Sequence, residues 1–281
     1  MLFVAHKPTN ISSNAFLSAL KRRFDNRTLG FSGTLDPFAS GTLVVASDKH
    51  TRLFSHFNLS PKVYIATLWL GVESPTLDIE KISCVSEIRA FSLEQICAVF
   101  ESLKGKITYT PPKFSAKKVG GIRAYKLARQ NADFALDSQE MEIFDITLIS
   151  YNHPFLNFKV SVSKGAYIRS LGAIIAQNLG TIGALSSLVR IKEGDFIFEN
   201  YKMLNVLDFL PYPKLEIPTL EIPHLRDKIY NGKKIHLDSA QKNQRYIAIF
   251  DDFFSIIRID FYGHVEYILN RIDLCWFYQG R

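Results

Sequence analysis

One acidic residue stands out because of the residues around it. Asp36 lies in the segment 30–41, GFSGTLDPFASG, where three glycines and Pro37 precede the apolar run TLVVAS. Glycine lets the backbone approach a ligand closely, and a residue before proline is biased away from helical conformations. A carboxylate held on such a loop could act as a nucleophile or as a general base. The residues alone leave open a structural role, in which Asp36 stabilises a turn or caps a helix.

A second candidate site lies in the segment 163–170, SKGAYIRS, between an alternating strand pattern and a helix pattern. It contains Tyr167 and Arg169. The planar guanidinium of arginine binds carboxylates and phosphates through paired hydrogen bonds. By themselves these residues fit equally a surface arginine in a turn and a core tyrosine.

A third candidate is the stretch from Lys104 to Arg129, which contains eight Lys and Arg residues and no acid. Aromatic residues are interleaved with these cations. Cations neutralise phosphates and aromatic rings stack on bases, so the stretch could grip RNA. A solvated basic face is the alternative. The candidate RNA-binding residues are Lys113, Lys117, Lys118, Arg123, Lys126 and Arg129.

Composition and missing motifs narrow the class of protein. The formal net charge of +7 favours an anionic partner, and no nucleotide-binding or metal-binding motif is present, so we expect neither a cofactor nor a metal. Cys84, Cys97 and Cys275 lack metal-site spacing, and we expect buried thiols in a reducing compartment. The apolar run at the start stops at His6, and no stretch approaches a membrane span, which predicts a cytoplasmic protein without membrane contact.

The hydrophobic periodicity predicts an α+β fold. One amphipathic helix follows Ser12 and Ser13, and another begins at Ser92, whose spacing to Gln95 is that of a capping box. A third, short helix is expected at residues 171–179. Alternating patterns predict strands at residues 62–70, 144–148 and 156–163, the last two forming a hairpin. We therefore expect a mixed, mainly antiparallel sheet flanked by helices.

Four prolines between residues 211 and 223 indicate a linker. We place a domain boundary there, with a catalytic domain at 1–222, containing an RNA-gripping insertion at about 105–140, and a small module at 223–281. Three strand-like runs follow the helical LRDKIYNG in this module, which is therefore expected to be rich in β-structure.

Taken together, these segments resemble the TruB family of pseudouridine synthases. The likeness covers about residues 5–196 and is carried by KPTNISSN, GFSGTLDPFASGTLVVASDKHTR, KVYIATLWLG with a later PTLD, YTPPKFSAKKVGGIRAYKLAR, VSVSKGAYIRSLG and LGTIGALSSLVRIKEGDF. The last 60 residues match loosely, around LRDKIYNGKKI, and resemble the start of a PUA-type RNA-binding module.

The resemblance implies a role for each matching residue. Asp36 takes the place of the catalytic aspartate, Tyr64 that of the tyrosine stacked on the target base, and Arg169 that of the ion-pair partner. Tyr167 and Leu188 match positions that line the uridine pocket.

The chain departs from the family pattern at a few positions. Phe31 replaces a common histidine and is expected to act as an apolar wedge during RNA opening. His6, Asn10 and Val189 also differ from the common pattern.

The implied activity is an isomerase, an intramolecular transferase that converts uridine 55 in the tRNA T loop into pseudouridine without a cofactor. The expected partner is the T arm of tRNA, with no obligate protein partner and a monomeric state. Three alternatives stay open: a similar synthase acting on another RNA, a non-catalytic RNA-binding or chaperone protein, and a glycosidase that uses Asp36 with a second acid such as Asp78.

Overall fold

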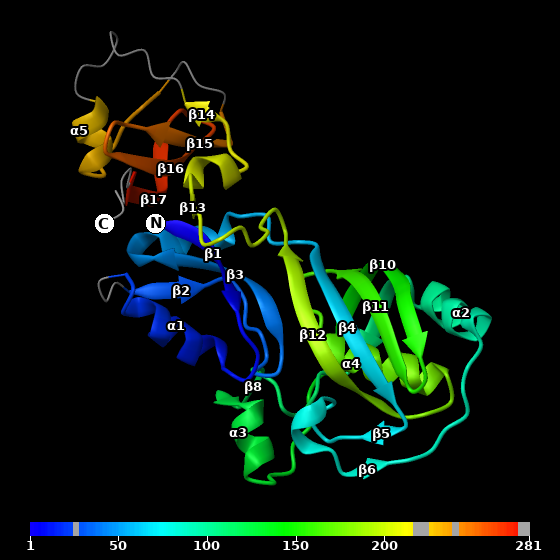
Figure 1. Ribbon diagram of the computed structural model, residues 1–281. Helices are drawn as coiled ribbons and strands as arrows, with labels where there is room; N and C mark the ends of the chain where they lie inside the picture. Colours follow the sequence, from blue (N-terminus) through cyan, green and yellow to red (C-terminus); the bar gives the residue numbers. More distant parts are fainter. Residues whose placement is uncertain (25–27, 216–224, 238–241, 275–281) are drawn as a thin grey trace.

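The computed structural model describes residues 1–24, 28–215, 225–237 and 242–274. Within these ranges a large sheet runs in the order β13-β1-β3-β12-β4-β11-β10-β7, with β2 added against β3 (Figure 1). Its strands are β1 (Leu2–Lys7), β2 (Leu29–Phe31), β3 (Ser40–Ser47), β4 (Lys62–Leu70), β7 (Gly105–Tyr109), β10 (Gln139–Asn152), β11 (Phe155–Val162), β12 (Gly183–Glu193) and β13 (Met203–Leu204).

The predicted α+β class is confirmed. Neighbouring strands of the large sheet pair antiparallel except β3 and β12, which pair parallel at Ser40 and Gly41. The predicted strand at 62–70 coincides with β4, and the predicted hairpin is β10 and β11. Burial alternates along β4 because successive side chains point to opposite faces of a sheet.

The helices cover the sheet as their apolar faces require. Helix α1 (Ser13–Lys21) buries Phe16, Leu17 and Leu20 against β1, β2 and β3. Helices α2 (Leu93–Leu103) and α4 (Ile168–Asn178) pack into one core with β4, β10 and β11 (Figure 1). The capping box predicted at the start of α2 is present, since Ser92 and Gln95 exchange hydrogen bonds of 2.9 and 3.2 Å.

Short elements connect these layers. The basic insertion starts inside the sheet as β7 and leaves it after Tyr109. It then forms a small hairpin and a helix, and it returns as β10. The short elements are η1 (Asp48–Ser55), β5 (Val72–Glu73), η2 (Ile79–Lys81), β6 (Cys84–Val85), β8 (Lys118–Val119), β9 (Ile122–Arg123), α3 (Ala124–Arg129) and η3 (Val206–Phe209).

The expectation of buried cysteines is wrong for two of the three. Cys84 and Cys97 are exposed free thiols, and Cys275 lies outside the described residues. Cys84 lies on β6, which pairs only with the two-residue β5, and Cys97 occupies the outer face of α2. Among the described residues, no helix is long and apolar enough to cross a bilayer.

A second sheet forms the C-terminal part of the chain. Its order is β14-β15-β16-β17, and helix α5 (Leu225–Tyr230) packs against it (Figure 1). The strands are β14 (Lys214–Leu215), β15 (Gln244–Ile249), β16 (Phe253–Ile259) and β17 (Val265–Asp273). The expected helix and three strands are all present, while the domain boundary chosen at residue 222 lies outside the described residues.

The two sheets share a hydrophobic core. Leu2, Val4 and Val44 of the large sheet belong to the same buried cluster as Phe254 and Ile272 of the small one. A polar contact supports this junction, because Lys49 Nζ donates to the carbonyl of Arg271 at 3.0 Å. The C-terminal module is therefore fixed to the large sheet by apolar burial.

Replacing Phe254 by alanine should destabilise both sheets together. The side chain is fully buried in the shared core, so the free energy of unfolding should fall by about 3–5 kcal/mol. Phe261→Ala is the matched control, because Phe261 is 74% exposed and its loss should change stability by less than about 0.5 kcal/mol. Urea unfolding followed by circular dichroism measures both. Two separate transitions, with the main one unchanged in Phe254→Ala, would contradict a shared core.

Candidate active site

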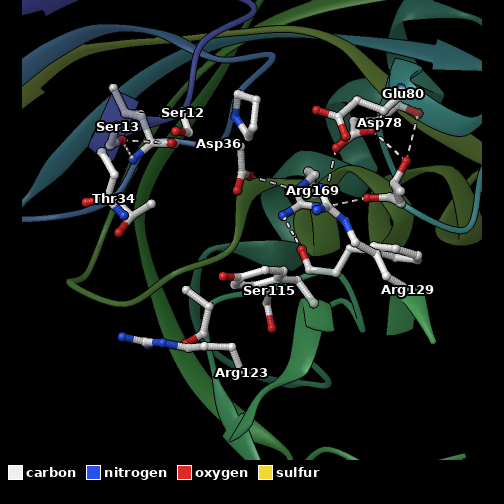
Figure 2. A pocket seen from close by; sticks show the side chains of 17 residues that line it. Ser12, Ser13, Thr34, Asp36, Asp78, Glu80, Ser115, Arg123, Arg129 and Arg169 are labelled. Carbon is white, nitrogen blue, oxygen red and sulfur yellow. Dashed lines mark hydrogen bonds and ion pairs between the residues drawn. The ribbon is translucent and has the colours of Figure 1, made fainter. Parts of the chain in front are cut away.

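A cavity of about 460 Å³ opens beside residues 30–41, called the Asp36 loop below (Figure 2). The start of α1, the η2 segment and the insertion at about 105–140, called the basic insertion, form its other walls. The side chains that line it include Asp36, Asp78, Glu80, Arg123, Arg129 and Arg169. This volume lies in the range of sites that hold small molecules or single nucleotides. The cavity thus brings together two of the sequence-predicted site residues, Asp36 and Arg169, with two of the predicted RNA-binding residues, Arg123 and Arg129.

Arg169 holds the Asp36 carboxylate in this cavity. Its Nε donates to Asp36 Oδ2 at 2.8 Å, although the two residues are 133 positions apart (Figure 2). The Asp36 side chain is 30% exposed, so it remains accessible from the cavity. Its carboxylate is used in this ion pair, while the turn at this point is closed by the backbone, with Ala39 N donating to Asp36 O at 3.1 Å. The arrangement fits a reactive carboxylate better than a turn-stabilising one.

The other guanidinium nitrogens of Arg169 join two further segments. NH1 donates to Thr76 O at 2.7 Å and lies 3.4 Å from Asp78 Oδ2, and NH2 donates to Phe114 O at 2.9 Å. Helix α4 begins earlier than predicted, at Ile168, and this places Arg169 in its first turn. A cation is unfavourable at a helix N-terminus, and the carboxylates of Asp36 and Asp78 offset that cost.

The structure adds Glu80 to the candidate residues, and it brings Asp78, expected from the sequence only as the second acid of a glycosidase, to the same cavity as Asp36. Asp78 is buried, and its Oδ1 accepts a hydrogen bond from the Thr76 hydroxyl at 2.5 Å. Partial burial and the neighbouring Asp78 carboxylate raise the pKa of Glu80. Asp78 could be noticed in the sequence as the acid of the PTLD segment, but only the fold brings it next to Arg169. Among the described residues, no group of His, Cys, Asp or Glu side chains has an arrangement that could hold a metal ion.

Buried polar side chains hold the backbone of the Asp36 loop through hydrogen bonds. Ser13 Oγ accepts from Leu35 N and donates to Leu35 O, both at 2.9 Å. Lys7 is fully buried and its Nζ donates to Ile11 O at 2.7 Å and to Pro37 O at 3.4 Å. Burial lowers the pKa of Lys7 to about 8, although Asp36 acts in the opposite direction. These contacts hold the residues on both sides of Asp36.

The remaining predicted substrate-binding residues do not line this cavity. Tyr64 and Leu188 are buried in the apolar cluster that also contains Leu35, and half-buried Tyr167 packs against the same cluster. Burial raises the pKa of Tyr64. Phe31 packs with a different cluster, around α1. This cluster, called the apolar floor below, therefore borders the cavity through Leu35, and Phe31 belongs to another cluster.

Most of the predicted RNA-binding side chains lie on the surface. Lys113, Lys118 and Lys126 are exposed, and Lys117 is half-buried. Arg129 lies over the ring of Tyr125, with 5.7 Å between the guanidinium carbon and the ring centre. The basic insertion thus presents cations around one wall of the cavity.

Comparisons with known proteins identify the class to which this fold belongs. The structure is similar to a solved H/ACA RNP bound to a substrate RNA containing 2′-deoxyuridine, with a TM-score of 0.64, 15% identity and coverage of 98% of this chain and 84% of that one. It is also similar to the archaeal box H/ACA sRNP Nop10-Cbf5 complex, with a TM-score of 0.62, 16% identity and coverage of 98% and 87%. These two likenesses, each over 98% of the chain, show that it shares the fold of the proteins in those complexes.

Sequence comparisons identify the family within this class. A family model described as TruB family pseudouridylate synthase (N terminal domain) matches residues 21–168. The tRNA pseudouridine synthase B of Helicobacter hepaticus is 51% identical over 97% of this chain and 95% of its own length. The protein of that name from Campylobacter jejuni (strain ATCC 700819) is 44% identical over 98% and 99%. The chain belongs to the TruB family of pseudouridylate synthases.

The contacts beneath the Asp36 loop can be tested through stability. Ser13→Ala removes the donor and acceptor that satisfy the buried N–H and C=O of Leu35, which should lower the free energy of unfolding by about 1–3 kcal/mol. Ser18→Ala is the matched control, because Ser18 is exposed on the same helix and should change stability by less than about 0.5 kcal/mol. Urea unfolding of both variants decides the question, and equal stabilities would exclude a structural role for the Ser13 hydroxyl.

Proposed function

We propose that this protein isomerises uridine 55 in the T loop of tRNA to pseudouridine, with Asp36 as the catalytic carboxylate. The observation that carries the proposal is the Asp36–Arg169 ion pair at a cavity flanked by the basic insertion. Membership of the TruB family and the names of its relatives support it. We expect the protein to act as a monomer in the cytoplasm, without a cofactor.

The reaction needs no external reagent, because atoms are rearranged within one nucleotide. The bond between N1 and C1′ breaks, the retained base turns, C5 bonds to C1′, and the proton on C5 is transferred to N1. The Asp36 carboxylate could add to C1′ or to C6, or abstract the C2′ proton. In each route the carboxylate must be held beside the sugar, and the 2.8 Å hydrogen bond from Arg169 Nε fixes its position.

The target base must leave its stack to reach Asp36. A base can stack on Tyr64 only if this side chain becomes accessible, because Tyr64 is buried in the apolar floor and does not line the cavity. Tyr167 and Leu188 belong to the same floor and would contact the base once it enters. Phe31, which is only partly buried against the cluster around α1, would act before this step as a wedge against the T loop.

Substituting Asp36 by asparagine should abolish pseudouridine formation while the fold is retained. The amide keeps the shape of the side chain but lacks the charge and the nucleophile, so turnover should fall by about 10⁴-fold or more. A carbodiimide-stop assay on unmodified tRNA transcript measures the product. Asp251→Asn, which changes an exposed carboxylate of the C-terminal module, should retain full activity.

The same assay separates the competing functions. Pseudouridine at another position, or in another RNA alone, would indicate a synthase with a different target. Tight RNA binding without any product in the wild type would indicate a non-catalytic RNA-binding protein. Base release without isomerisation would indicate a glycosidase that uses Asp36 with Asp78.

Removing charges from the basic insertion should weaken RNA binding and its salt dependence. With Lys113, Lys118 and Lys126 changed to glutamine, the slope of log Kd against log salt should fall by about 2–3, close to one unit per lost phosphate contact. The value of kcat at saturating tRNA should stay within about twofold, since these side chains do not line the cavity. Filter binding at several salt concentrations measures the slope. Lys159→Gln, an exposed change on β11, is the control, and an unchanged slope in the triple variant would mean that the insertion does not bind phosphate.

A further inference from the structure

Three charged side chains form a buried cluster beneath the Asp36 loop. Lys62 Nζ lies 2.8 Å from Glu193 Oε1, and Arg190 NH2 lies 3.2 Å from Glu193 Oε2. The Arg190 and Glu193 side chains are fully buried. None of the three lines the cavity that holds Asp36, so they do not contact a substrate there.

A gain in folding stability does not by itself explain why these three charged residues are buried together. Burial, together with the nearby Arg190 guanidinium, lowers the pKa of Lys62 against the opposing effect of Glu193. Buried ion pairs can often be replaced by apolar side chains without loss of stability. The cluster is therefore better explained by what else its members bind.

Arg190 also holds both ends of the Asp36 loop. Its Nε donates to Thr42 O at 2.8 Å, and its NH2 donates to Gly33 O at 3.0 Å. Gly33 lies three residues before Asp36 and Thr42 six residues after it. One guanidinium thus closes the loop at its base and ties it to strand β12.

Close packing of the loop on its neighbours requires glycine at two positions. A Cβ atom on Gly33 would lie 2.7 Å from Lys62 Nζ and 3.1 Å from Glu193 Oε1. Gly41 has a φ of +112°, and a Cβ there would lie 2.2 Å from Arg190 O. The loop can lie directly on the charged cluster only because both positions lack a side chain.

We propose that Arg190, oriented by Glu193, is a positioning residue that fixes the backbone of the Asp36 loop for catalysis. Arg169 orients the carboxylate of Asp36 from the cavity side, and Arg190 fixes the main chain that carries it. Reacting groups must be held within a fraction of an ångström, so a loosened loop costs turnover without changing RNA binding. This inference rests on the proposed function for its kinetic consequence, but not for the hold of Arg190 on the loop.

The test compares Arg190→Lys with Lys62→Met. A lysine at position 190 keeps the charge beside Glu193 but cannot reach Gly33 O and Thr42 O together. Lys62→Met removes a member of the cluster that has no bond to the loop, and Arg190 and Glu193 remain as a pair. Gly33→Ala serves as a second loop variant if Arg190→Lys does not fold, because its Cβ pushes the loop away from Lys62 and Glu193.

Two measurements are made on the full chain, at a temperature where circular dichroism shows every variant folded. In hydrogen exchange, the peptide covering residues 30–42 should exchange at least tenfold faster in Arg190→Lys than in the wild type. In Lys62→Met its exchange rate should equal that of the wild type. With tRNA transcript, kcat of Arg190→Lys should fall by about 10–100-fold with KM within about twofold, and Lys62→Met should keep its kcat.

The proposal would be overturned if Arg190→Lys kept the loop exchange rate and the kcat of the wild type. Equal losses in Arg190→Lys and Lys62→Met would also overturn it, because the effect would then come from the cluster as a whole. If the wild type makes no pseudouridine in tRNA, the proposed function fails. The exchange rates then still decide whether Arg190 holds the loop.

Discussion

The hydrogen bonds of Arg169 connect the parts of the molecule on which any chemistry at this site depends. One guanidinium binds the Asp36 carboxylate, the Asp78 carboxylate, and the carbonyls of Thr76 and Phe114. These partners come from the glycine-rich loop, the η2 segment and the basic insertion. Because the donors of arginine lie in a fixed plane, moving one partner disturbs the alignment of the others. The position of the insertion and the orientation of Asp36 are therefore linked through a single rigid group.

A second arginine, Arg190, fixes the main chain of the loop that carries Asp36. Arg169 acts on a side chain at the cavity, whereas Arg190 acts on main-chain carbonyls beneath it. The apolar floor that contains Leu35, Tyr64 and Leu188 borders the cavity through Leu35. The parallel pairing of β3 with β12, which meets at Gly41 and Arg190, brings the end of the loop onto the same strand. The carboxylate is thus held by one arginine and the main chain that carries it by another.

Local patterns predicted the elements well, because each depends on residues close in sequence. The capping box at Ser92 and the alternating strand β4 are such cases. The Asp36–Arg169 pair spans 133 positions and was expected only through the family resemblance. The buried ionic residues were missed, since a charged residue in a single sequence is read as a surface residue unless its partner is known. Arg190 and Glu193 sit in a strand whose pattern gives no sign that their side chains point inward.

The core shared by the two sheets has a consequence for the order in which the chain can fold during synthesis. Leu2 and Val4 are made long before Phe254 and Ile272, yet they are buried in the same cluster. Domains generally fold on the ribosome as their residues emerge. Leu53, Phe57 and Phe196 of this cluster are made earlier, so only the part of the apolar face that the C-terminal module covers stays exposed until nearly the whole chain has left the exit tunnel. A nascent or prematurely terminated chain would display that face to chaperones and proteases, so completeness of the C-terminal module acts as a check on the product of translation.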